Sequence, residues 1–310
     1  MRKRCLKTIY EMAKLNENIV FIGSDLGQGT LDEFKNEMPG RFFMEGISEQ
    51  HIISMATGLA MEGKEVFVNT IATFITRRCF EQNIIDLGMT KAKVRLIGNG
   101  GGLVYAPLGP THLAFEDIAI MRTIPNMTII VCSDADEMER AIKASIDYPG
   151  PIYFRIAKGG DPIVSKEELG FKIGKPIIFK NPAEVTLISC GVMVDRALKV
   201  SAHFEKLGVN VGVLNCHTLK PLDEDFILNS ILSSKIVMTL EEHSVIGGLG
   251  SIVSDLIAEK CYHHKVVFKK MALPDVFPEK YGSQNLLIDF YKIGENNIIK
   301  ELEKLLAMIN

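Results

Sequence analysis

Along this chain, short continuous runs of apolar residues alternate with longer segments in which apolar residues recur every three or four positions. The runs, such as those at 19–22, 129–132 and 211–214, are typical of strands that are buried on both faces of a sheet. The longer segments have the period of helices with one buried face. Strands and helices in regular alternation predict an α/β fold with two doubly wound domains and mainly parallel sheets.

A change of composition in the middle of the chain separates the two predicted domains. Residues 158–184 are rich in Gly, Pro and Lys and show no sustained helical period, which is typical of a connector. We therefore expect a first domain at 1–157, a connector at 158–184 and a second domain at 185–310. A length of 310 residues agrees with two domains, since about 100–200 residues per domain is usual.

Composition and charge argue against several classes of protein. The formal net charge of -3 gives no electrostatic reason to expect a nucleic acid or an anionic membrane as a partner. No apolar run approaches the ~20 residues of a membrane span. The N-terminal segment predicts an amphipathic helix rather than a signal peptide, with Leu6, Ile9, Tyr10 and Ala13 on one side. The cysteines are scattered and unpaired in the sequence, which predicts a cytoplasmic location.

The segment GISEQHIISMATGLAMEG, at 46–63, predicts a strand-to-helix turn followed by a helix rich in small residues. Ser48 is the expected N-cap, and Gly63 is expected to end the helix. Glu49 then lies in the first turn, next to an apolar face. By spacing alone, this carboxylate would be a favourable charge at a helix N-terminus.

Four loops of the first predicted domain follow strands, and ligands of parallel sheets collect at the carboxyl ends of strands. The loops are GSDLGQGT, GISEQ, NTIATF and GNGGGLVYAPLGPTH. The glycines of the last loop would let a backbone approach a ligand closely. They form no dinucleotide or phosphate fingerprint, because neither G-x-G-x-x-G at a strand-helix turn nor a Gly-Lys-Ser/Thr ending is present.

Four segments resemble, in order, motifs of transketolase and of 1-deoxyxylulose-5-phosphate synthase, which are thiamine diphosphate enzymes. They are GISEQ at 46–50, TIATFITRRCFEQ at 70–82, GPTH at 109–112 and EEHSVIGGLGS at 241–251. The resemblance covers nearly the whole chain. It implies a pyrimidine-binding domain followed by a transketolase C-terminal-like domain.

The resemblance also implies roles for single residues. Glu49 would contact the aminopyrimidine of thiamine diphosphate and, together with His112, would be catalytic. Phe74 resembles the aromatic residue that stacks on the aminopyrimidine, and Ile71 replaces a second one. The chain is one residue longer than the family pattern between Phe74 and Gln82, so two adjacent arginines are candidates for the family's single arginine. These are Arg77 and Arg78. The predicted cofactor contacts are Glu49, Phe74, Ile71, Asp25 and Arg78.

On the substrate side, the chain departs from the family pattern at three positions. Leu108 stands where the family has an Asp, Gly100 where transketolases have a His, and Lys158 where the family has an Arg for the substrate phosphate. A lysine is a point charge and lacks the bidentate fork of an arginine. With His112, these are the predicted substrate residues, and the resemblance implies a non-standard sugar rather than an ordinary pentose phosphate.

The Gly-Asp-Gly motif, with which the family holds the cofactor's diphosphate and a divalent metal, does not occur in the sequence. The resemblance therefore implies the β-type subunit of a split transketolase that transfers a two-carbon ketol unit between a ketose and an aldehyde. The partner would be an N-terminal-section transketolase subunit in an α2β2 heterotetramer. That subunit would bind most of the Mg²⁺ or Ca²⁺, and no metal ligand is assigned to this chain.

Several alternatives stay open at this point. The β subunit of a 2-oxoacid dehydrogenase has the same two domains and also lacks the diphosphate module, although TRRCFEQ and GPTH favour transketolase. A fragment of a 1-deoxyxylulose-5-phosphate synthase is disfavoured because the chain begins with its own helix. A non-catalytic scaffold subunit fits Leu108 and Gly100, and a flavodoxin-like binding protein would fit the fold alone.

Overall fold

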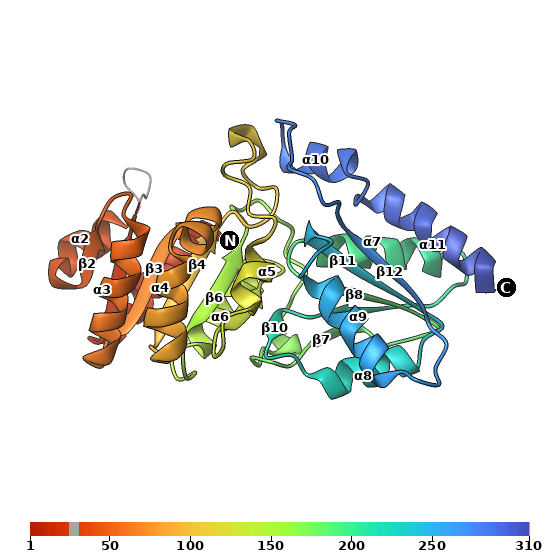
Figure 1. The fold of residues 1–310 in the computed structure, drawn as a ribbon, viewed down its shortest axis with the longest axis horizontal. Helices are drawn as coiled ribbons and strands as arrows, with labels where there is room; N and C mark the ends of the chain where they lie inside the picture. Colours follow the sequence, from red (N-terminus) through yellow and green to blue (C-terminus); the bar gives the residue numbers. More distant parts are fainter. Residues whose placement is uncertain (25–30, 310) are drawn as a thin grey trace.

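The computed structural model describes residues 1–24 and 31–309, and these form two α/β units that lie next to each other (Figure 1). Within these residues, the first sheet has seven strands in the order β10-β5-β6-β4-β3-β1-β2. All neighbours are parallel except β10, which is antiparallel to β5. The strands are β1 (Ile19–Gly23), β2 (Phe42–Met44), β3 (Glu65–Ile71), β4 (Val94–Asn99), β5 (Thr128–Val131), β6 (Ile152–Ile156) and β10 (Thr218–Lys220).

Helical segments cover both faces of this sheet, so its central strands are buried along nearly their whole length. Those of the first unit are α1 (Arg2–Leu15), α2 (Asp32–Glu37), α3 (Glu49–Met61), α4 (Phe80–Gln82), α5 (Asp117–Arg122) and α6 (Ala135–Ala144), with π-helical turns at Phe74–Arg78 and Asn83–Met89. One core forms where α1 and α6 pack against each other. The prediction for the N-terminal helix is confirmed, since Leu6, Ile9, Tyr10 and Ala13 are all buried.

The second sheet of the described chain has five strands in the order β12-β11-β8-β9-β7, with β7 antiparallel to β9. Its helices lie on both sides of the sheet (Figure 1). The strands are β7 (Ile177–Lys180), β8 (Val185–Ser189), β9 (Val211–Asn215), β11 (Ile236–Ser244) and β12 (Val267–Leu273). The helices are α7 (Met193–Glu205), α8 (Glu224–Leu232), α9 (Leu249–Lys260), α10 (Gln284–Phe290) and α11 (Glu295–Ile309). The predicted α/β fold with two mainly parallel sheets is confirmed.

Three short elements differ from the expectations. The predicted connector contains β7, which joins the second sheet, and β10 passes from the second unit to the edge of the first sheet. Helix α10 was not predicted either. Strands of three or four residues are too short to show an alternation of apolar and polar positions, and both β7 and β10 are edge strands. The domain bounds stay predictions, and β10 ties the two units together.

Two general expectations can be compared with the structure. All six cysteines lie in the described residues, where each is a buried free thiol. Within the described parts of the chain, no helix is long and apolar enough to cross a membrane.

The junction between the units contains buried polar side chains. Asn215 Nδ2 of β9 donates to Glu137 Oε1 of α6 at 2.6 Å. The imidazole of His217 stacks on Phe171, with 4.2 Å between ring centroids, and its Nδ1 lies 2.9 Å from Thr218 Oγ1. Burial lowers the pKa of His217 to about 4. The folded junction therefore holds this imidazole neutral.

This burial predicts a contribution of His217 to acid sensitivity. The unfolded chain takes up a proton on His217 below its ordinary pKa of about 6.5, whereas the folded chain does so only near pH 4, so stability is lost as the pH falls between these values. We expect the free energy of unfolding to fall by about 2 kcal/mol less between pH 7.5 and pH 5 in His217→Asn than in the unsubstituted chain. Urea unfolding at both pH values measures this. His51→Asn, at an exposed histidine, is the control, and an equal fall in all three proteins would contradict the prediction.

Candidate active site

The parallel strands β1, β3, β4 and β6 place the loops that follow them at one edge of the first sheet. The turn before α3, the π-helical turn after β3 and the long loop after β4 meet there. In Figure 1, the loop after β4 extends beyond the sheet and lies beside the segment that leads into α10. Contacts confirm this proximity, because the rings of Phe115 and Phe277 pack edge to face with centroids 6.3 Å apart.

Glu49 is the first residue of α3, and its side chain is only 1% exposed. Its Oε2 accepts a hydrogen bond from Arg78 Nη1 at 2.8 Å. Its Oε1 is buried and has no hydrogen-bond partner within residues 1–24 and 31–309. A buried carboxylate oxygen without a donor is unfavourable by roughly 1–3 kcal/mol. The arrangement is therefore suited to a ligand that brings a donor to Oε1.

The expected cap of this helix takes a different form. Ser48 is at the N-cap position, as predicted, but its hydroxyl donates to Glu45 O at 2.7 Å and caps no N–H of the first turn. The prediction of a side-chain cap is therefore wrong. The hydroxyl instead closes the turn between β2 and α3, which directs Glu49 inward. At the other end, Gly63 follows the helix with φ +83, as expected for a residue that ends a helix.

A line of contacts runs from Glu49 through Arg78 and Phe74 to His112. The guanidinium carbon of Arg78 lies 4.5 Å from the ring centroid of Phe74, which is a cation–π contact. The rings of Phe74 and His112 meet edge to face, with centroids 5.3 Å apart. His112 Nδ1 lies 2.9 Å from Thr111 Oγ1. The structure thus brings together four predicted site residues from α3, the first π-helical turn and the loop after β4.

The two candidate arginines face different partners. Arg77 forms an ion pair with Glu116 and donates from Nη2 to Leu113 O at 3.0 Å. Arg78 alone reaches Glu49. Both belong to the π-helical turn Phe74–Arg78, in which each turn accommodates one residue more than an α-helical turn. Of the two, Arg78 is the arginine beside the buried carboxylate.

The other predicted residues that the structure describes lie at strand ends and in loops of the first unit. Gly100 has φ +74, and a Cβ atom there would overlap the ring of Tyr105. Leu108 is 50% exposed on the loop after β4, and Lys158 is exposed just after β6. Ile71 ends β3 and is half-buried. Asp25 lies outside the described residues.

The sequence analysis missed Tyr105. This tyrosine is buried, and its ring covers the backbone where transketolases were expected to have a histidine side chain. The positive φ of Gly100, together with this ring, leaves no room for a larger residue. A tyrosine inside an irregular loop carries no periodic signal, so only the positions of the folded loop show its role.

Comparison with known proteins agrees with this geometry. The family described as "Transketolase, pyrimidine binding domain" matches residues 1–160, and "Transketolase, C-terminal domain" matches residues 174–298. The "Putative transketolase C-terminal section" of Methanocaldococcus jannaschii is 34% identical over 97% of this chain and 95% of its own length. An apulose-4-phosphate transketolase subunit of Phocaeicola vulgatus is 32% identical over 96% of this chain and 95% of its own length.

A solved structure agrees as well. The chain described as "Split gene transketolase, inactive beta4 tetramer" superimposes with a TM-score of 0.87 at 32% identity, covering 99% of this chain and 97% of that one. Taken with the family matches, this chain belongs to the transketolase family and is a transketolase-like transferase subunit. Its pyrimidine-binding domain implies dependence on thiamine diphosphate. These matches give no support to the 2-oxoacid dehydrogenase alternative.

The contact between Arg78 and Glu49 predicts unequal effects of two neighbouring substitutions. Arg78→Ala leaves the buried Glu49 without its donor, which we expect to lower the free energy of unfolding by about 1–3 kcal/mol. Arg77→Ala breaks a half-exposed pair and should cost about 1 kcal/mol or less. Urea unfolding of both variants measures the difference. A loss in Arg77→Ala as large as in Arg78→Ala would show that Arg78 does not sustain the buried carboxylate.

Proposed function

We propose that this chain is the β-type subunit of a split transketolase that transfers a two-carbon ketol unit from a ketose to an aldehyde. One observation carries the proposal: Oε1 of Glu49 is buried and lacks a hydrogen-bond donor among the described residues, while Oε2 is bound by Arg78. A protonated ring nitrogen of the aminopyrimidine of thiamine diphosphate is such a donor. When bound, this cofactor supplies the carbanion-stabilising thiazolium that two-carbon transfer requires.

In this proposal, the residues of this chain position the proton that is shared with the pyrimidine ring and orient the cofactor and the substrate. When the cofactor is bound, Glu49 would share a proton with the pyrimidine ring through Oε1, and Arg78 holds the carboxylate by donating to Oε2. Phe74 offers an aromatic face for stacking. His112 has its Nδ1 beside Thr111, which leaves Nε2 to bind a substrate hydroxyl. Glu49, Arg78 and Phe74 thus form the pyrimidine half of a cofactor site, and His112 lies beside it.

A second polypeptide supplies the other half in this proposal. The sequence contains no Gly-Asp-Gly motif, and the related chains described as a split-gene product and as a transketolase subunit support a divided enzyme. The partner is an N-terminal-section subunit that binds the diphosphate and most of the Mg²⁺ or Ca²⁺. The complex is an α2β2 heterotetramer in the cytoplasm and serves carbohydrate metabolism.

Reconstitution with a partner chain tests the proposal. Alone, the purified chain should bind thiamine diphosphate poorly and turn over no ketose. Mixed with a chain that carries Gly-Asp-Gly, it should sediment as an α2β2 particle with transketolase activity. In that particle, Glu49→Gln should slow exchange of the cofactor's C2 proton by orders of magnitude while assembly is retained, because an amide cannot share the proton in the same way.

Glu45→Gln, in the turn before the same helix, is the matched control and should exchange at the unsubstituted rate. The non-catalytic scaffold alternative predicts assembly without turnover. Unaided turnover by a monomer of this chain would overturn the need for a partner. An unchanged C2 exchange rate in Glu49→Gln would show that Glu49 is only a charge at a helix N-terminus, which stabilises the helix by about 0.3–1 kcal/mol.

The substrate proposed here is a non-standard sugar. Leu108 gives an apolar side chain where the family has a hydroxyl-binding carboxylate, Tyr105 fills the space above Gly100, and Lys158 offers a single exposed charge. The name of the Phocaeicola vulgatus relative specifies apulose 4-phosphate, which supports a specialised sugar in this branch of the family. Here the donor or acceptor is deoxygenated, branched or otherwise substituted near Leu108.

Leu108→Asp tests this substrate proposal. A substrate hydroxyl left unpaired beside Leu108 costs about 1–3 kcal/mol when the assembled site buries it, so the aspartate should raise kcat/KM for xylulose 5-phosphate by about 5- to 150-fold. Leu108→Asn is the control, because it restores polarity without charge and should give a smaller gain. Ordinary transketolase efficiency with xylulose 5-phosphate before substitution, and no gain with aspartate, would refute the altered-substrate proposal.

A further inference from the structure

Glu242 of β11 reaches out of its own domain toward the active-site loop. Its side chain is 3% exposed, and its Oε1 accepts a hydrogen bond from the backbone N–H of Leu103 at 2.9 Å. Gln284 Nε2, at the start of α10, donates to Oε1 at 2.9 Å and to Oε2 at 3.0 Å. The second domain thus holds the beginning of the loop after β4 through one carboxylate.

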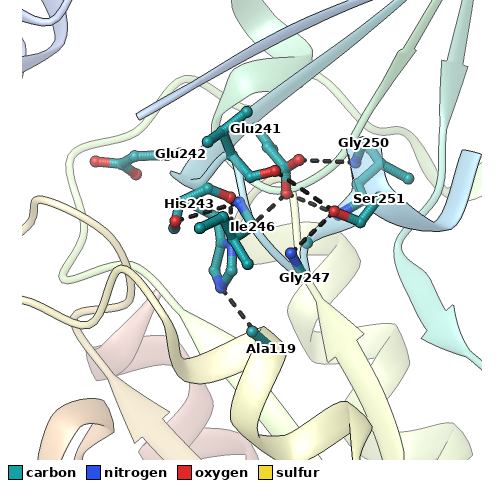
Figure 2. Close-up of polar contacts among 12 residues, drawn as sticks. Ala119, Glu241, Glu242, His243, Ile246, Gly247, Gly250 and Ser251 are labelled. Carbon is teal, nitrogen blue, oxygen red and sulfur yellow. Dashed lines mark hydrogen bonds and ion pairs between the residues drawn. The ribbon is translucent and has the colours of Figure 1, made fainter. Parts of the chain in front are cut away.

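The neighbouring Glu241 makes a useful contrast. Its two carboxylate oxygens accept hydrogen bonds from Leu249 N and Gly250 N at 2.7 Å each, in the first turn of α9. Figure 2 shows the Glu241 carboxylate directed toward Gly250 and the Glu242 carboxylate directed to the opposite side. Successive strand residues point to opposite faces of a sheet. One glutamate therefore serves its own domain, and the other serves the first domain.

The backbone at Gly102 fits closely against Glu242. Gly102 has φ +71, and a Cβ atom there would lie 2.5 Å from Glu242 Cδ. Gly102 and Ala114 exchange backbone hydrogen bonds of 2.7 and 3.2 Å, which close the loop 102–114 at its base. His112 and Leu108 both lie within this closed loop. Movement at its base would displace both side chains.

A second link holds the far end of the same loop. Arg155 Nη2 donates to Ala114 O at 2.9 Å and to Glu242 O at 2.8 Å. Its Nε donates to Asp117 Oδ2 at 2.8 Å. Burial raises the pKa of Glu242, although the positive charge of Arg155 lowers that pKa in part. A buried carboxylate is costly unless donors surround it, and the donors here are the loop itself and Gln284.

We propose that Glu242 is a positioning residue that sets the place of loop 102–114, and through it of His112 and Leu108. The C-terminal domain then acts on substrate geometry although it contributes no side chain to the line of contacts at Glu49. What the loop does with substrate rests on the proposed function. The anchoring of the loop is a property of the folded chain and can be measured without cofactor or partner.

Hydrogen–deuterium exchange of the intact chain, followed by mass spectrometry, tests the anchor. In Glu242→Gln, one carboxylate oxygen becomes an amide nitrogen and the negative charge is lost, so Leu103 N and Gln284 Nε2 share one neutral acceptor and the bond to Leu103 weakens. We expect backbone exchange in residues 102–114 to become at least about tenfold faster. The reversed pair Glu242→Gln with Gln284→Glu restores a donor opposite an acceptor and should return exchange to the unsubstituted rate.

Two further variants separate anchoring from general destabilisation. Glu241→Gln is the matched control: it should accelerate exchange at the start of α9 and leave residues 102–114 unchanged. Gln284→Leu removes the side-chain donor of Glu242 at a half-exposed position and leaves the bond from Leu103 N without this support. Backbone exchange in residues 102–114 should then become severalfold faster, even if Glu242→Gln does not fold. Three outcomes would each overturn the proposal. The first is an unchanged exchange rate of residues 102–114 in both Gln284→Leu and Glu242→Gln, and the second is an equally large acceleration there in Glu241→Gln. The third is no recovery of the exchange rate in the reversed pair.

Activity in the reconstituted complex gives the second readout. Glu242→Gln should lower kcat about tenfold and leave thiamine diphosphate affinity within about twofold, because Glu49, Phe74 and Arg78 lie on other elements. The reversed pair should recover kcat. If the unsubstituted complex has no transketolase activity, the proposed function fails while the exchange result stands. If the complex is active but the exchange rate of residues 102–114 does not change when Glu242 is substituted, the positioning role is wrong and the proposed function is unaffected.

Discussion

The site depends on one constraint, which is that a buried carboxylate must be supplied with hydrogen-bond donors. Glu49 is placed by the turn between β2 and α3, deep enough that water does not reach either oxygen. Arg78 satisfies Oε2, and nothing in the described residues satisfies Oε1. An isolated helix-end charge would remain in water, where it needs no such partner. At the sheet edge where the strand-end loops meet, burial with one satisfied oxygen therefore fits a site that a ligand completes.

The π-helical turn after β3 explains how the arginine reaches this carboxylate. This turn is wider than an α-helical turn, in which successive residues are rotated by about 100°. The wider turn presents Arg78 to Glu49 and Arg77 to Glu116. Phe74 opens the same turn and lies under the Arg78 guanidinium. One irregular turn thus orients the cation and the aromatic ring together.

Much of the fold could be predicted because its strands are continuously apolar and its helices are periodic. The position of Glu49 also followed from a local pattern, as did the grouping of Phe74 and His112 through resemblance. The choice between Arg77 and Arg78 could not be predicted, since it depends on how a turn is wound. The side-chain cap expected from Ser48 failed because its hydroxyl found a closer acceptor in Glu45 O. Strands β7 and β10 went unrecognised because edge pairing of three or four residues leaves no period to detect.

Contacts between distant parts of the chain are invisible to any local pattern, and they decide how the two domains cooperate. Leu103 and Glu242 are 139 positions apart, and neither carries a signal that points to the other. Their hydrogen bond ties the loop after β4 to β11, which is an interior strand of the second sheet. Without this bond the base of the loop would be less restrained. β10 adds a second tie by pairing with β5 at the edge of the first sheet. A loop held from a neighbouring domain keeps its geometry, and the proposed division of the site between two polypeptides requires this.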